Sequence, residues 1–344
     1  SGTEPNTKIM VGASGVNAFL GTADKSMGVQ VTNANLGLVV YGNGTYALDA
    51  SAAAALVGFE SILSLSGTLG VRVNTTGGLV DEKVMVNGTE VKILFTAEQG
   101  NVQGFSGNVN LSIAGFVTLS GDFAFEKQVS GATTKILVGA ANINAFLGTA
   151  DGSMGVRVTK ANLGLALFKT GSAASTYALD ASAAAALVGF DNILSLSGTL
   201  GVRVNTTGVA VDETVSVKGT PVNILFSDQQ KNVQGFSGSV ALEIAGFVTL
   251  SGDFAFTKSV EKDASGNITK TKILVGAANI NAFLGTTDGS MGVRVTNANL
   301  GLALFKTGTA TTYALDASAA AALVGFDNIL SLSGTLGVRV NTTG

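Results

Sequence analysis

The string YALDASAAAALVGFDNILSLSGTLGVRVNTTG occupies residues 177–208 and recurs unchanged at all 32 positions of residues 313–344. Residues 46–77 differ from it at two positions, where Glu60 and Ser61 stand in place of Asp191 and Asn192. Self-similarity of this kind is the signature of a repeat architecture, in which each copy packs against its neighbours. The chain is therefore built from copies of one unit.

The boundaries of the copies follow from a second shared string, which begins at Lys8, Lys135 and Lys272, so that the periods are 127 and 137 residues. These starts predict a first repeat at 8–134, a second at 135–271 and a partial third at 272–344. Residues 1–7 are interpreted as a lead-in, with Ser1-Gly2 left by expression. We expect two full repeats and part of a third, cut from a longer array.

Turns are placed by the differences in length between copies, which fall at residues 41–45 and 130–132 and at their counterparts 169–172 and 263–267. Tolerated insertions mark exposed loop tips. A third tip, Asn87-Gly88, carries the strongest short hairpin signal, because a type I′ turn needs positive φ at both central residues. Three tips divide a repeat into three segments, each expected to bend at a central Gly-Phe pair such as Gly189-Phe190.

Strands are predicted over most of the chain, which has only two Pro and is rich in Val, Ile, Leu, Phe and Thr between Gly and Asn. The alanine-rich residues 181–188 could form a short helix, since Ala has the highest helix propensity. We favour a strand or an irregular segment there because the surrounding sequence is of β type. The fold class predicted is all-β.

Composition excludes several classes of function. The chain has no Cys, His or Trp, which rules out disulfides and any site built on Cys or His ligands or nucleophiles. Charged residues make up 12% of the sequence and the net charge is −3, and scattered cations are not the basic patch that nucleic acids require. We expect no enzyme activity, no catalytic residue, no cofactor and no nucleic-acid partner.

The mean hydropathy of +0.43 is high for a soluble chain. A membrane helix needs about 18 or more consecutive apolar residues, and the uncharged stretch 101–121 is interrupted by Asn, Gln, Ser and Gly. We therefore expect a protein that does not span a membrane and whose many small apolar residues fill a narrow core.

Two architectures are compatible with these repeats. In the favoured one the strands stack into an elongated solenoid-like rod with protruding hairpins, and neighbouring repeats share one core. In the alternative, each repeat is a closed β-domain on a string. The junction at residues 125–136 favours the rod, because it resembles a hairpin tip and lacks the features of a flexible linker.

Candidate chemistry is sparse. The adjacent acids Asp81-Glu82 and Asp212-Glu213 would point to opposite faces of a strand, so we interpret them as solvated charges near a hairpin. The stretches beginning at Asp151 and Asp288 lack the ligand spacing of a calcium loop and are interpreted as Asp-initiated turns. No metal-binding residue is assigned, and a calcium site built from distant strands is left open.

The five arginines share one motif, Gly-Val-Arg-Val, at Arg72, Arg157, Arg203, Arg294 and Arg339. They could form a row that binds glycans or anions. The simpler interpretation is a solvated face whose arginines pair with acids such as Asp180 or Asp191. The Asn-x-Thr sequences at Asn74, Asn205 and Asn341 could be glycosylated, although turn formation explains them more simply.

A resemblance follows from two stretches, ILVGAANINAFLGTADGSMGVRV at residues 136–158 and GFVTLSGDFAF at residues 246–256. They resemble the tandem β-strand repeats of giant adhesin-like surface proteins of Gram-negative bacteria, and the similarity extends over the chain after residue 7. The resemblance implies an exported, extracellular fibre or stalk whose partners are the neighbouring repeats and an unidentified cell-surface or glycan ligand. It supplies no catalytic or ligand residues.

We therefore expect a structural stalk that provides length and stiffness. The first alternative is an ice- or carbohydrate-binding solenoid, suggested by the Thr296–Asn299 region, although one such segment per repeat is sparse for a binding array. The second is a β-helix enzyme acting on polysaccharides, which would need clustered carboxylates that the sequence scatters.

Overall fold

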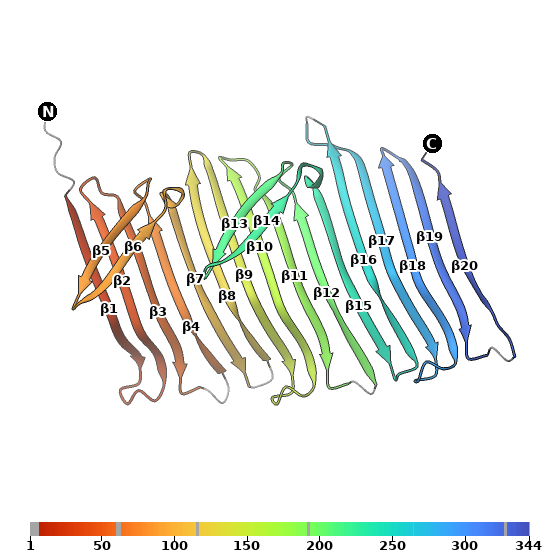
Figure 1. The fold of residues 1–344 in the computed structure, drawn as a ribbon. Helices are drawn as coiled ribbons and strands as arrows, with labels where there is room; N and C mark the ends of the chain where they lie inside the picture. Colours follow the sequence, from red (N-terminus) through yellow and green to blue (C-terminus); the bar gives the residue numbers. More distant parts are fainter. Residues whose placement is uncertain are drawn as a thin grey trace. The chain divides into compact units, whose positions relative to one another are not determined.

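A computed structural model describes residues 7–59, 63–114, 117–190, 193–263, 265–326 and 329–343. They form strands and two short 3₁₀ turns, so the all-β prediction is confirmed (Figure 1). The first copy contains β1 (Lys8–Gly21), β2 (Gly28–Tyr41), β3 (Tyr46–Val57), β4 (Leu63–Asn74), β5 (Val80–Val86), β6 (Thr89–Phe95), η1 (Ala97–Gln99), β7 (Val102–Ile113) and β8 (Val117–Ser130).

The second copy contains the same series of elements and the third contains its first four strands. These are β9 (Thr133–Gly148), β10 (Gly155–Thr170), β11 (Thr176–Val188), β12 (Leu194–Asn205), β13 (Val211–Val217), β14 (Thr220–Phe226), η2 (Asp228–Gln230), β15 (Val233–Ile244) and β16 (Val248–Lys262), followed by β17 (Ile268–Gly285), β18 (Gly292–Thr307), β19 (Ala310–Val324) and β20 (Ser333–Asn341).

Sixteen strands belong to one open antiparallel sheet in the order β1-β2-β3-β4-β7-β8-β9-β10-β11-β12-β15-β16-β17-β18-β19-β20, and β5-β6 and β13-β14 are separate two-stranded sheets. Contacts divide the chain into two compact units. One comprises Ser1–Phe146, Asn162–Thr176 and Glu213–Asn223, and the other comprises Leu147–Ala161, Tyr177–Asp212 and Ile224–Gly344.

The described residues form neither the stacked coils of a solenoid nor a closed domain. Coils stack when a strand continues into a crossover and returns parallel, but here the long strands reverse direction from one to the next, across a turn or, after β4 and β12, across the short hairpin. Gly58, Gly189 and Gly325 adopt positive φ of 85°, 83° and 82° at equivalent turns, a conformation that glycine adopts without strain. Antiparallel pairing of neighbours in sequence is the consequence.

The predicted tips are confirmed as turns, and the predicted central bends are confirmed in part. Asn87 and Gly88 have φ of 46° and 84°, as a type I′ turn requires. Gly189-Phe190 lies at the turn between β11 and β12, and Gly246-Phe247 lies at the turn between β15 and β16, whereas Gly235-Phe236 lies inside β15 without a bend. A repeat therefore consists of six long strands and one short hairpin.

The alanine run is a strand, as favoured from the sequence. Ala181 to Ala186 pair in antiparallel register with residues 202 to 197 of β12. An isolated helix of eight residues is too short to be stable in water. As a strand, the same residues form backbone hydrogen bonds with the neighbouring strands of the sheet.

The two faces of the sheet in the first unit differ in polarity. On β4, β7 and β8 the paired residues Val71, Phe105 and Phe125 share one face, and the rings of Phe105 and Phe125 stack at 5.3 Å. The other face carries small polar residues such as Ser106 and Asn108. Val71 and Phe105 remain exposed on the apolar face.

The buried core lies on the polar face, where the hairpin β5-β6 covers β1, β2 and β3 (Figure 1). Alternate hairpin residues point inward, so that Val80, Val91, Ile93 and Phe95 are buried while Leu94 is exposed. The cluster that they form with the sheet consists of Val39, Ala47, Val80, Ile93, Phe95 and Val102, with Met10 and Tyr41 packed against it.

Candidate functional site

The candidate site is the strip of sheet on which each hairpin lies, which we call the hairpin groove. In the first copy its floor includes Gly12 and Gly37. A Cβ atom placed on Gly12 would lie 2.7 Å from Val84 Cγ1, and one on Gly37 would lie 2.6 Å from Ile93 Cγ1. Both distances are shorter than real contacts, so the glycines allow the hairpin to approach the sheet closely.

An arginine holds one side of the hairpin. Arg72 Nε donates to Asp49 Oδ2 at 3.0 Å, and its Nη2 donates to the carbonyl of Leu94. The guanidinium also lies 4.4 Å from the ring centroid of Phe95. Arg72 thus binds the sheet and the hairpin together, using the planar fork and the cation–π contact that distinguish arginine from lysine.

The second copy repeats this arrangement. Arg203 Nε donates to Asp180 Oδ2 at 3.0 Å, its Nη2 donates to the carbonyl of Leu225, and the guanidinium lies 4.5 Å from the Phe226 ring centroid. A Cβ on Gly139 would lie 2.6 Å from both Val215 Cγ1 and Val217 Cγ2. The predicted pairing of arginine with Asp180 is confirmed, while Asp191 lies outside the described residues.

The other side of the hairpin is held by the second acid of each acidic pair. Lys8 Nζ donates to Glu82 Oε2 at 2.7 Å and Tyr41 Oη donates to Glu82 Oε1 at 3.3 Å. Burial and the neighbouring carboxylate raise the pKa of Tyr41. Lys135 makes the same bond to Glu213 at 2.8 Å. Glu82 therefore docks the hairpin, whereas Asp81 is exposed as predicted.

A buried asparagine shapes the entry to each hairpin. Asn74, 1% exposed, donates to the Gly78 carbonyl at 2.9 Å and accepts from the Thr76 amide at 2.9 Å. Asn205 is 0% exposed and makes the same bonds to Val209 and Thr207. These turn bonds confirm the simpler interpretation of the Asn-x-Thr sequences, and burial leaves the Asn74 and Asn205 amides inaccessible to a glycan in the folded chain.

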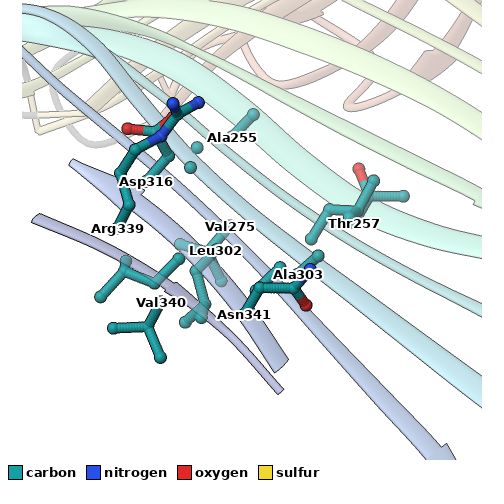
Figure 2. A pocket seen from close by; sticks show the side chains of 14 residues that line it. Ala255, Thr257, Val275, Leu302, Ala303, Asp316, Arg339, Val340 and Asn341 are labelled. Atoms are coloured by element: carbon teal, nitrogen blue, oxygen red, sulfur yellow. The ribbon is translucent and has the colours of Figure 1, made fainter. Parts of the chain in front are cut away.

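The third copy has the same floor, but among its described residues no hairpin lies on it. An open groove of about 840 Å³ occupies the place, and Figure 2 shows Arg339, Asp316 and Ala303 lining it. Arg339 still bonds to Asp316, but its side chain is 84% exposed, against 36% for Arg72. Nothing lies within 4 Å of a Cβ placed on Gly276.

The aspartate turns are confirmed where the structure describes them. Ser153 donates its amide to Asp151 Oδ1 at 3.0 Å, and Ser290 does the same to Asp288. Thr286 Oγ1 donates to Asp288 Oδ1 at 2.6 Å. These bonds favour the charged form, so the pKa of Asp151 and of Asp288 falls to about 2.

The asparagines near Thr296–Asn299 close bulges in the strands. The Asn297 amide donates to Asn281 Oδ1 at 3.2 Å, the Asn279 amide donates to Asn299 Oδ1 at 3.3 Å, and Asn299 Nδ2 donates to the Asn297 carbonyl at 2.7 Å. Asn279 and Asn297 have positive φ, which asparagine tolerates. Part of the hydrogen-bonding capacity expected to bind ice or sugar is thus used within the sheet.

Arg294 of the same motif lies on β18 and does not join the groove. Arg294 lies 5.5 Å from the Phe283 ring centroid and donates to the Gly289 carbonyl at 3.5 Å. Arg72, Arg203 and Arg339 pair with an aspartate of the sheet and Arg294 does not share that arrangement, a difference that the common sequence motif did not reveal.

Neither a metal site nor a membrane helix is found in the described ranges. Within them, no group of three or more Asp or Glu residues is placed to hold a metal ion. Among the same residues no helix has the length and hydropathy to cross a membrane. Comparison with protein-family models, curated proteins and solved structures finds no match to this chain.

The hairpin groove was missed by the sequence interpretation, which placed the hairpin as a protruding tip. A signal was nevertheless present. The residues of 80–95 alternate so that one face is Val, Ile and Phe, and a strand pair with one apolar face must bury it against another element. The paired glycines at Gly12 and Gly139 are the complementary signal on the sheet.

Proposed function

We propose that this chain is a structural segment of an extracellular bacterial surface protein, a stalk whose repeats provide length and stiffness. One observation carries the proposal. Two copies with nearly the same sequence form the same six strands and the same hairpin, held by Arg72 in one and Arg203 in the other. A further copy can therefore be joined to the sheet with contacts that the chain already uses.

The chemistry of the described residues supports a structural role. The ion pairs bind hairpin to sheet, as Lys8 does with Glu82, and the aspartates with lowered pKa close turns, as Asp288 does. Charged groups are thus engaged in holding the fold. Neighbouring repeats of the same chain are the partners that this role needs.

The proposal of an extracellular location is tested on cells that produce the protein. Antibodies against residues 135–271 should label intact cells, and protease added outside should remove the label. A control antibody against a cytoplasmic protein should label only permeabilised cells. Labelling of the repeat that requires permeabilisation would contradict the surface location.

Carbohydrate or ice binding is a second candidate, because the polar face of the sheet in the first unit presents short Ser, Thr and Asn side chains on neighbouring strands. Thr68 pairs with Asn108, and Ser66 pairs with Asn110 in the β4-β7 register. Inhibition of ice recrystallisation, or binding to a glycan array that Asn108→Lys abolishes, would support it. Inactivity in both assays would leave the stalk proposal alone.

A further inference from the structure

The groove of the third copy is chemically the same surface that hairpins cover in the first two copies. Residues 313–344 are identical to residues 177–208, and Ala303 corresponds to Ala166 of the second copy. Ala166 and Ala178 are fully buried, whereas Ala303 and Ala314, their counterparts, are half-buried. Leu137 is 2% exposed and its counterpart Leu274 is 39% exposed.

The polar groups at this groove are also left with fewer partners than their counterparts. Arg203 bonds to a hairpin carbonyl and lies against Phe226, while Arg339 has the bond to Asp316. Asn205 is fully buried and bonds to the start of its hairpin, whereas Asn341 is exposed. Two independent features, the apolar floor and the arginine, thus point to the same type of occupant.

We propose that the groove formed by β16 to β20 is a docking site for a β-hairpin of the β13-β14 type, the element that directly follows the fourth strand in each of the first two copies. The chemistry of this partner is set by the two hairpins in place. One face carries Val, Ile and Phe at alternate positions, a glutamate stands two positions after the first Val, and a turn with glycine forms the tip.

Each part of such a hairpin has a defined place in the groove. The isoleucine equivalent to Ile93 lies over Gly301, because Ile93 lies over Gly37 in the first copy. The phenylalanine equivalent to Phe226 stacks on the Arg339 guanidinium, and the preceding carbonyl accepts from it. Lys272 forms an ion pair with the acid equivalent to Glu213, as Lys135 does.

In the second copy the tip of the hairpin extends to β8, the strand next to β9 in the sheet. Lys218, at the tip of β13-β14, lies 3.4 Å from Asp122 of β8. Asp253 is the counterpart of Asp122 on β16, and Ala255 and Thr257 of the same strand line the open groove. A lysine at the tip therefore has an acid to pair with, and β16 belongs to the docking surface.

The first test adds a fluorescein-labelled peptide of residues 209–230 to the full chain and measures anisotropy. We expect saturable binding of one peptide per chain. The peptide with Ile224→Asp should bind more than tenfold more weakly, because this side chain points inward. The matched control, Leu225→Asp, changes the outward neighbour and should retain binding.

The site on the chain is tested with Ala303→Arg, which fills the groove, and with Thr309→Arg, which adds the same charge in the exposed turn after β18. The first should abolish peptide binding and the second should not. Circular dichroism of both variants checks that the sheet is intact. Binding that survives Ala303→Arg would overturn the proposal.

Isolated hairpins are marginally stable in water. In a second experiment, residues 209–232 are therefore fused to the chain directly after Gly344. Hydrogen exchange in β17–β20 should slow in this extended chain, and Ala303→Arg should reverse the change. Unchanged exchange together with no peptide binding would overturn the proposal. Self-association of the 344-residue chain that Ala303→Arg abolishes would assign the groove to a second copy and would also overturn it.

The docking proposal and the stalk proposal can fail separately. Hairpin binding depends only on the groove, and an intracellular chain would show it equally. A surface-exposed stalk whose third groove binds no hairpin would retain the first proposal and lose the second.

Discussion

The glycines beneath the hairpins are the residues whose effect is easiest to isolate. Gly139→Ala forces a methyl against Val215 and Val217, which are both β-branched and stiff. We expect a loss of about 1–3 kcal/mol in the free energy of unfolding, typical of overpacking. Urea unfolding followed by circular dichroism measures it.

Gly276→Ala is the matched control, since Gly276 is the counterpart of Gly139 in the third copy and open space surrounds a Cβ placed on it. We expect a change of less than about 0.5 kcal/mol, as for surface substitutions. Equal losses for the two variants would show that close approach of the hairpin is not what requires glycine at Gly139.

The buried asparagines form a second pair with a built-in control. Asn205→Ala removes the hydrogen bonds that this fully buried side chain makes to the Val209 carbonyl and to the Thr207 amide. A cost of about 1–3 kcal/mol follows from the loss of two such hydrogen bonds. Asn341→Ala, at an exposed position, should cost clearly less, and thermal unfolding of both variants compares them.

The carboxylate of Asp288 provides a prediction about pH. Its pKa of about 2 lies below the usual 3.8, with the Thr286 hydroxyl as the largest cause. The bonds of this turn therefore stabilise it fully above pH 3.8, and the stabilisation is lost as the pH falls toward 2. Carboxyl carbon NMR should show the low pKa, and Thr286→Val should raise it toward 3.8. A pKa near 3.8 in the unmodified chain would contradict the bonding.

At the scale of elements, the hairpin should separate from the sheet as a unit. Ile224 is fully buried, so Ile224→Ala should cost about 2–5 kcal/mol of docking free energy. Hydrogen exchange should accelerate in β13-β14 and in the covered strands β9 and β10. Leu225→Ala, on the exposed side, should leave exchange there unchanged. Acceleration confined to the hairpin turn would contradict docking through Ile224.

The elements also show what the sequence could predict and why it failed elsewhere. The tip at Asn87-Gly88 was predictable because its φ values are set locally by two residues. Whether the strands form stacked coils or one open sheet depends on pairing between distant strands, and alternation along a single strand is the same in both. The direction of each turn, and not the pattern of apolar residues, decides between them.

The candidate site, like the fold, could be predicted from the sequence only in part. Pairing of Arg203 with Asp180 was predictable from charge and repeat position, but its contact with Phe226 depends on the hairpin folding back over the sheet. The sequence of residues 211–226 does not show which part of the sheet this hairpin covers. The glycines of β1 and β9 mark the covered surface, and they lie about 70 residues before the hairpins in the sequence.

At the scale of the whole molecule, the central claim is that copies extend one sheet. Each full copy adds six strands to it, as β9, β10, β11, β12, β15 and β16 do. Strands lie about 4.8 Å apart, so each copy should add about 29 Å in the direction across the strands. A stalk function requires this growth to continue with copy number.

Small-angle X-ray scattering tests this claim most directly, on chains in which residues 135–271 are present once, twice and three times. We predict a maximum dimension that rises by a constant step of about 29 Å for each added copy. Growth as the square root of copy number would indicate flexible beads, and no growth would indicate copies folding onto one another. Either result would contradict the account of an extending sheet.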